Sequence, residues 1–257
     1  MNCLEVYRRK LVREINIQFR MILVEPGKDP VHDFRLGVKR LTAFFYFLQS
    51  VDPRIKTKKI LKPYRGLFKA IGRVRDLHIA EDLLSDLNFS KIDINKLKKR
   101  EKQYYQSFRY IVDESKISGI RVPTVSSLSI PDQSILAGKN PYLETLLKAI
   151  CSVDKRMTQK AWHRKRIILK RYHHTLDAFQ HCAGHELAEE EMKQMRMLEQ
   201  LLGDWHDRVI SAELISTHSL TGSEEKFREL RKQERTLISA ARTYLYKYSA
   251  WHSITLH

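Results

Sequence analysis

The chain has 257 residues, and its 47 Lys and Arg against 30 Asp and Glu give a formal net charge of +17. Apolar residues make up 42% of it, enough for a buried core, which excludes a wholly disordered protein. Three dispersed cysteines and the lack of any run of about 18 apolar residues exclude a disulfide framework, a zinc finger and a transmembrane span. We therefore expect a soluble cytoplasmic protein, in a reducing compartment, whose partner is a polyanion.

Helical periodicity extends over almost the whole chain. Asp-Pro pairs, which suit a helix start, open the second and third predicted helices at Asp29 and Asp52. The second helix carries an apolar stripe at Phe34, Val38, Leu41, Phe45 and Leu48. The predicted helices cover about residues 4–23, 29–49, 52–84, 90–115, 142–156, 158–182, 186–217 and 223–249.

A change in composition separates two groups of four helices. Three of the seven prolines lie between Ser118 and Pro141, where no helical stripe is visible. We therefore predict an all-α protein in which residues 1–118 and 141–257 each form four helices, with residues 119–140 as a connector.

An internal repeat supports this division. At an offset of 131 residues, eight identities hold one register over 45 positions. Coincidence among Lys and Arg is easy in so basic a chain, but the register also aligns histidine, glycine and aspartate. The pairs are His32/His163, Arg35/Arg166, Lys39/Lys170, Arg40/Arg171, Lys62/Lys193, Arg65/Arg196, Gly72/Gly203 and Asp76/Asp207. We interpret the repeat as a duplication.

The repeated basic residues form rows on helix faces. Positions i, i+3 and i+7 share a face, so His32, Arg35 and Lys39 line one edge of their helix, beside its apolar stripe. Like charges at this spacing repel one another, and no acidic residue alternates with them in the row. We therefore expect each row to meet an anion, and guanidinium forks with adaptable ammonium groups suit phosphate oxygens.

A second element follows each row. It reads Gly72-Arg73-Val74-Arg75-Asp76 in the first half and Gly203-Asp204-Trp205-His206-Asp207 in the second. Glycine inside a helix costs up to about 1 kcal/mol relative to alanine, so we expect close packing or a kink at both glycines. We expect each aspartate to orient a basic neighbour or to cap a broken helix.

The doubled His-x-x-Arg-x-x-x-Lys-Arg motif, followed each time by Gly-x-x-x-Asp, resembles the CHAD domain family over roughly residues 4–249. The resemblance implies one CHAD domain over residues 1–257, made of two four-helix bundles related by a pseudo-twofold axis around a basic central cavity. It also implies binding of inorganic polyphosphate and, in bacteria and archaea, association with polyphosphate granules.

The sequence thus predicts a non-enzymatic polyphosphate binder, since no P-loop, nucleophile elbow or cysteine nucleophile motif is present. A nucleic-acid binder and an accessory subunit that presents polyphosphate to an enzyme stay open as alternatives. We expect no cofactor, metal or membrane partner, and we expect sulfate or phosphate ions to be able to replace polyphosphate. The candidate polyphosphate-binding residues are His32, Arg35, Lys39, Arg40, Lys62, Arg65, Arg73, Arg75, His163, Arg166, Lys170, Arg171, Lys193, Arg196 and His206.

Overall fold

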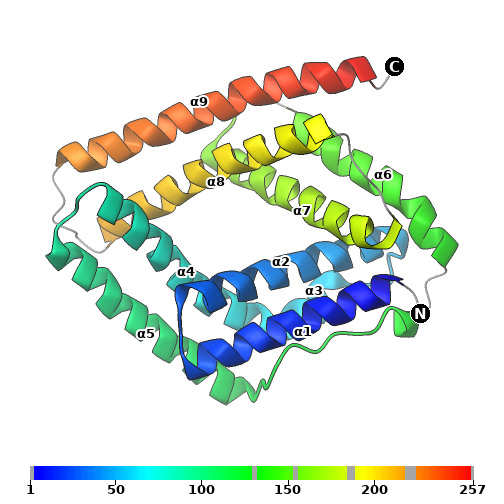
Figure 1. Ribbon diagram of the computed structural model, residues 1–257, viewed down its shortest axis with the longest axis horizontal. Coiled ribbons are helices and arrows are strands. Elements are labelled where there is room, and N and C mark those ends of the chain that lie inside the picture. The colour runs from blue at the N-terminus through cyan, green and yellow to red at the C-terminus, as the bar shows by residue number, and fades with distance from the viewer. Residues whose placement is uncertain (1–2, 129–131, 153–155, 184–188, 218–223, 256–257) are drawn as a thin grey trace. The chain divides into compact units, whose positions relative to one another are not determined.

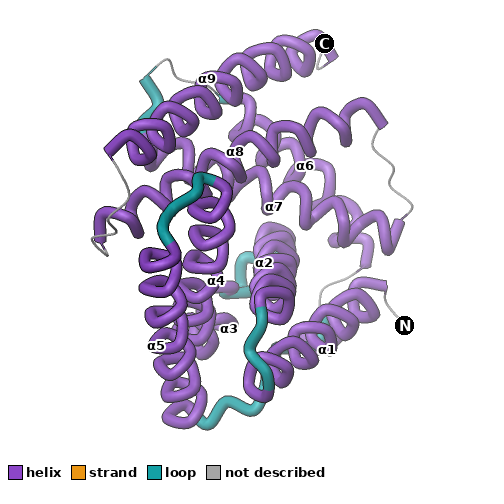
Figure 2. The backbone as a smooth tube through the Cα atoms, turned by 60° about the vertical axis from the view of Figure 1, so that its left-hand side comes forward, coloured by secondary structure: helices purple, strands orange, loops and turns teal. Residues whose placement is uncertain are grey.

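The structure is a computed structural model that describes residues 3–128, 132–152, 156–183, 189–217 and 224–255. Within these ranges all regular secondary structure is helical, which confirms the predicted all-α class (Figure 2). The longer helices are α1 (Cys3–Val24), α2 (Lys28–Val51), α4 (Arg65–Asp86), α5 (Lys91–Ser115), α6 (Asp132–Cys151), α7 (Gln159–Ala183), α8 (Glu189–Thr217) and α9 (Glu224–Thr255). The short ones are α3 (Thr57–Leu61), η1 (Lys62–Tyr64) and η2 (Ser126–Leu128).

The third predicted helix, residues 52–84, is interrupted. Pro63 has no N–H to donate to a preceding carbonyl, and a 3₁₀ turn, η1, stands between α3 and α4. Asp52 does not start this helix but ends α2, because its N–H donates to the Leu48 carbonyl at 2.9 Å. The Asp52 carboxylate accepts hydrogen bonds from Arg54 at 2.8–3.0 Å.

Helix α6 starts at Asp132, inside the segment predicted as a connector. Pro141, the last of the three prolines by which we delimited the connector, lies in the interior of this helix. The irregular chain before it includes residues 117–125 and the short helix η2. Period and composition thus placed this helix start about ten residues too late.

Contacts within the chain divide it into two compact units. Unit 1 contains Met1–Arg75, Lys102–Thr145 and Arg171–Glu186. Unit 2 contains Asp76–Glu101, Leu146–Lys170 and Leu187–His257. Each unit draws on both halves of the sequence, so the units do not coincide with the predicted repeats. The duplication and its two four-helix bundles remain predictions.

The core of unit 1 is aromatic. Helix α1 packs along α2 (Figure 1), and the predicted α2 stripe from Phe34 to Leu48 is buried. Phe19 contacts Phe34 and Phe108 with ring centroids 6.0 and 6.1 Å apart. At Gly37, Ile15 of α1 comes so close that an added methyl group would overlap it. The absence of a side chain at Gly37 therefore allows α1 and α2 to pack closely.

The core of unit 2 is built around α8, which packs against α9. Trp162 and Trp205 are buried, as expected for core residues, together with Leu198 and Leu202. The ammonium group of Lys165 is buried as well, and it donates hydrogen bonds to the carbonyls of Ala149, Ile150 and Ser152. This lysine therefore caps the carboxyl-terminal end of α6.

The cysteines differ in state. Cys3 is disulfide-bonded, which the dispersed cysteines did not predict, whereas Cys151 is a half-buried free thiol. The side chain of Cys182 lies outside the described residues.

Among the helices that the structure describes, none combines the length and the apolar character needed to cross a membrane.

Candidate anion-binding site

The first copy of the motif lies on α2 in unit 1. His32 is exposed, and Arg35, Lys39 and Arg40 are half-buried. The Arg35 guanidinium lies 4.8 Å from the centre of the Phe68 ring, and its Nη1 donates a hydrogen bond to the Phe68 carbonyl at 3.3 Å. These contacts hold Arg35 of α2 against the first turns of α4.

Gly72 makes this position of Arg35 possible. A methyl group at Gly72 would overlap Nη1 of Arg35, so only glycine leaves room for the guanidinium in this position. The close packing predicted from the recurring glycine is confirmed here. Gly203 shows no such close packing. Apart from its chain neighbours and the nearby backbone of its own helix, no atom lies within 4 Å of the position that an added methyl group would take.

Exposed cations continue along the neighbouring segment from α3 through η1 into α4. Within α4, Arg65, Lys69 and Arg73 follow one another at intervals of four residues and therefore share one helical face. Lys58 and Lys62 precede them on α3 and η1. We call these residues the α4 row, and all five are exposed: Lys58, Lys62, Arg65, Lys69 and Arg73.

Our sequence prediction identified Lys62, Arg65 and Arg73 of this row but missed Lys58 and Lys69. A simpler signal was available, because residues 53–75 contain nine Lys and Arg and no Asp or Glu. The remaining predicted residue of this segment, Arg75, is half-buried.

The end of the first motif has an acidic neighbour. Nε of Arg40 lies 3.9 Å from Oδ2 of Asp177 on α7. Burial alone would raise the pKa of Asp177, but a hydrogen bond with His174 and the charges of His173 and Arg40 outweigh burial and lower it. Asp177 therefore stays ionised and offsets the charge of Arg40.

Arg171, the repeat partner of Arg40, is also in unit 1. Its guanidinium lies 4.0 Å from the centre of the Tyr46 ring, a cation–π contact. Burial raises the pKa of the nearby Tyr142 to about 12, although Arg171 opposes this shift. Arg171 thus packs against aromatic side chains of unit 1.

Three residues of the second copy of the motif, His163, Arg166 and Lys170, lie in unit 2, where carboxylates act on two of them. Nζ of Lys170 forms an ion pair with Glu199 at 2.8 Å. The pKa of Arg166 is lowered by burial, and the nearby charges of Asp207, Glu199 and Asp76 oppose this shift without cancelling it. The α8 and α4 helices thus supply acids that spacing within α7 does not reveal. The charges of Asp76 and Asp207 both act on Arg166, and whether either aspartate orients a basic neighbour stays a prediction.

Two histidines of unit 2 lie together. The rings of His163 and His206 are 4.9 Å apart between centroids. Burial and the charge of Arg166 lower the pKa of His163, so its ring is neutral at pH 7. The exposed residues Lys193 and Arg196 complete the predicted set, and Lys193 lies 4.0 Å from Glu190.

The two units therefore differ in charge. Unit 1 has 24 Lys and Arg against 12 Asp and Glu, and unit 2 has 23 against 18. The balances are +12 and +5. The larger positive balance makes unit 1 the stronger attractor of an anion.

We found no arrangement suited to a metal among the described residues, where three or more His, Cys, Asp or Glu side chains never gather into a possible ligand group.

Comparison with known proteins agrees with the fold and the motif. The model of the CHAD domain family matches residues 135–216. No curated protein matches the sequence. The structure is similar to the CHAD domain from the plant Ricinus communis, with a TM-score of 0.67 and 14% identity over 95% of this chain and 90% of that one. It is also similar to PptA from Streptomyces chartreusis, with a TM-score of 0.59 and 14% identity over 97% and 98% of the two chains.

The fold and the cationic surface thus define an all-α, basic protein with the helical architecture of CHAD domains. The matching segment contains the second copy of the repeated motif, at His163, Arg166, Lys170 and Arg171. The resemblance predicted from the motif is thus supported by the family model over residues 135–216 and by the fold.

Proposed function

We propose that this protein binds linear inorganic polyphosphate through the cationic surface of unit 1. The observation that carries the proposal is the α4 row, whose five exposed cations follow one another along a segment that has no acidic residue. His32, Arg35 and Lys39 of α2 extend this surface, because Arg35 contacts α4 at Phe68. The CHAD resemblance points to the same ligand.

The charge pattern favours a linear polyanion over isolated anions. Neighbouring members of the row are three or four residues apart, so their Cβ atoms are about 5–6 Å from one another and their charges repel. A chain of phosphates removes this repulsion along the whole row at once and releases its own counterions. Single phosphate ions would relieve it only locally, so we expect affinity to rise with chain length.

The aromatic residues of this surface favour phosphate over nucleic-acid bases. Arg35 and Arg73 lie over the rings of Phe68 and Tyr104, at 4.8 and 5.6 Å from their centres. Single-strand binders instead present open rings on which bases stack. A guanidinium that covers a ring leaves its phosphate-binding edge accessible but competes with a base for that ring face.

A pair of matched variants tests the proposal. The first replaces four members of the α4 row with glutamine: Lys58, Lys62, Arg65 and Lys69. The second replaces four exposed cations of α5, again three lysines and one arginine: Lys91, Lys99, Arg100 and Lys102. Both lose the same charge, and neither changes Arg35 or Arg166, which pack against other residues.

Binding of labelled long-chain polyphosphate is then measured by fluorescence anisotropy over a range of salt concentrations. We expect the affinity of the α4-row variant for polyphosphate to fall about tenfold or more. The slope of log affinity against log salt concentration should become smaller in magnitude by about 3. The α5 variant should bind nearly as the original does. Equal losses in the two variants would contradict the site, and displacement of polyphosphate by single-stranded DNA at equal phosphate concentration would favour the nucleic-acid alternative.

We further propose that the protein does not transform polyphosphate, that it is cytoplasmic, and that it associates with polyphosphate granules where these exist. Incubation with polyphosphate and a colorimetric phosphate assay tests the first point, since steady phosphate release would identify an enzyme. Localisation of a fluorescent fusion before and after polyphosphate depletion tests the others. A stable complex with a polyphosphate-metabolising enzyme would instead favour the accessory-subunit alternative.

A further inference from the structure

Helices α8 and α9 of unit 2 form an open groove that contains none of the residues of the α4 row. It has a volume of about 830 Å³. Met197 and Leu201 line its α8 side. Residues of α9 from Arg235 to Lys247 line the other side: Arg235, Thr236, Ser239, Ala240, Thr243, Tyr244 and Lys247.

The two helices are antiparallel along this groove. Arg208 of α8 donates a hydrogen bond to Gln233 near the start of α9, whereas Met197, three turns earlier on α8, lines the groove with Tyr244, three turns later on α9. The lining residues of α9 extend over 12 positions, which is about 18 Å of helix. A third helix of that length fits along such a groove, as in helix-in-groove recognition.

The groove has the surface that a packed helix requires. Met197 is 49% exposed although it is apolar and belongs to a helix whose opposite face is core. Methionine adapts its shape to a partner more easily than branched side chains do. The exposed positions Thr236, Ser239, Ala240 and Thr243 are small, so that a backbone can approach α9 closely.

The charges of the groove select among occupants. Arg235 and Lys247 are both exposed and stand at its two ends along α9. A second copy of this groove, packed face to face, would bring cations to cations. An acidic helix would place carboxylates beside both of them.

We propose that the α8–α9 groove is a docking site for an acidic amphipathic helix of a partner protein. The apolar face of that helix packs on Met197, Leu201 and Ala240, and its flanking carboxylates pair with Arg235 and Lys247. The site belongs to unit 2 and stands independently of the α4 row of unit 1, so that one can fail while the other holds.

Designed peptides of about 18 residues provide the probes. The first is an amphipathic helix with leucine and alanine on one face and glutamate beside it. The second contains the same residues in scrambled order, and the third has lysine in place of glutamate. Each is labelled with fluorescein and titrated with the full chain, with anisotropy as the measurement.

Ala240→Arg is the decisive variant. It fills the groove with a bulky side chain at an exposed helical position, yet it raises the net charge. If the acidic peptide is attracted only by the overall positive charge, this variant should bind it more tightly. If the peptide docks in the groove, the variant should bind it more weakly. The double variant Arg235→Glu with Lys247→Glu tests the two end charges, and Lys91→Glu with Lys99→Glu on α5 matches its change in charge.

We expect the acidic amphipathic peptide to bind at least about tenfold more tightly than the scrambled one, and Ala240→Arg to remove that difference. The groove double variant should prefer the lysine peptide, while the α5 double variant should retain the original preference. Equal binding of all peptides, no binding of any, or unchanged binding by Ala240→Arg would overturn the proposal. So would a dimer in light scattering that Ala240→Arg converts to a monomer, because a second copy would then occupy the groove. Polyphosphate affinity measured on the same variants reports separately on the proposed function.

Discussion

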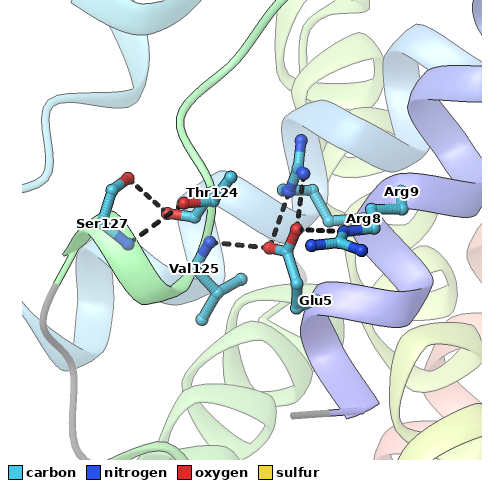
Figure 3. Close-up of polar contacts among 6 residues, drawn as sticks. All are labelled: Glu5, Arg8, Arg9, Thr124, Val125 and Ser127. Atoms are coloured by element: carbon cyan, nitrogen blue, oxygen red, sulfur yellow. Dashed lines mark hydrogen bonds and ion pairs between the residues drawn. The ribbon is translucent and has the colours of Figure 1, made fainter. Parts of the chain in front are cut away.

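Replacing Glu5 with glutamine should destabilise unit 1 strongly. The Glu5 carboxylate accepts hydrogen bonds from Arg8 at 2.6 and 2.9 Å, from Arg9 at 2.9 Å and from the backbone N–H of Val125 at 2.8 Å (Figure 3). Glu5 and Arg8 are both buried, at 2% and 7% exposure. This cluster joins α1 to the irregular segment that precedes η2.

Two independent considerations give the size of the effect. Removing one partner of a buried ion pair leaves the other charge uncompensated, which costs about 3–5 kcal/mol. Hydrogen bonding from Arg8 lowers the pKa of Glu5 from 4.5 to about 2 against the opposing effect of burial, and the Val125 N–H and Arg9 contribute in the same direction. A lowering of that size corresponds to about 3 kcal/mol of stability.

The sign of the pH dependence follows. A carboxyl group whose pKa is lowered by folding stabilises the folded state fully above its unfolded pKa of about 4.5 and loses this contribution as the pH falls toward 2. The Glu5→Gln variant lacks the contribution at every pH. The difference between the original protein and the variant should therefore be about 3 kcal/mol at pH 7 and about half of that at pH 3.

Urea unfolding followed by circular dichroism at the two pH values measures this difference. Glu25→Gln, at an exposed glutamate just after α1, is the control and should change stability by less than about 0.5 kcal/mol. The double variant Glu5→Leu with Arg8→Met removes both charges and should recover most of the loss. A Glu5→Gln variant as stable as the Glu25→Gln control at pH 7 would refute the reasoning.

Three further predictions concern single positions. Gly203→Ala should stabilise the protein by about 1 kcal/mol in urea unfolding because no atom opposes the added methyl group, whereas Gly72→Ala should gain nothing and weaken polyphosphate binding by displacing Arg35. Lys165→Met should cost about 2 kcal/mol in the same assay, since three carbonyls at the end of α6 lose their charged donor, and an unchanged midpoint would argue against the cap. Burial raises the pKa of the Cys151 thiol, although Lys165 opposes it, so iodoacetamide should alkylate Cys151 more slowly in the folded protein than in urea at the same pH.

The sequence allowed the helices to be predicted well wherever one face is apolar. The stripe from Phe34 to Leu48 identified the buried face of α2 because a single core lies on one side of that helix. The break at Pro63 was missed because charged residues on both sides of it continue the helical spacing. Asp52 was misread because aspartate stabilises turns at either end of a helix, and only the folded chain shows which end it serves.

The site was predicted in part, and the omissions have a specific cause. Lys58 and Lys69 were passed over because neither recurs 131 residues later, where the chain has Glu189 and Gln200, and neither lies in the Gly-x-x-x-Asp element. Glu199 was not expected beside Lys170 because helical spacing relates residues only three or four apart. An acid that arrives from another helix depends on packing, which the local pattern does not encode.

The repeat register explains why its two copies differ in charge. Phe68 and Glu199 occupy equivalent positions, 131 residues apart, and each lies beside the equivalent arginine of its own unit. In unit 1 the Arg35 guanidinium lies over the ring of Phe68, whereas in unit 2 the carboxylate of Glu199 acts on Arg166 and pairs with Lys170. The equivalent arginine thus contacts an aromatic ring in one unit and lies near carboxylate charges in the other. A count of the cations repeated in the two copies would assign both copies the same role. The residue packed against each arginine, however, determines how much of the arginine's charge a ligand can use.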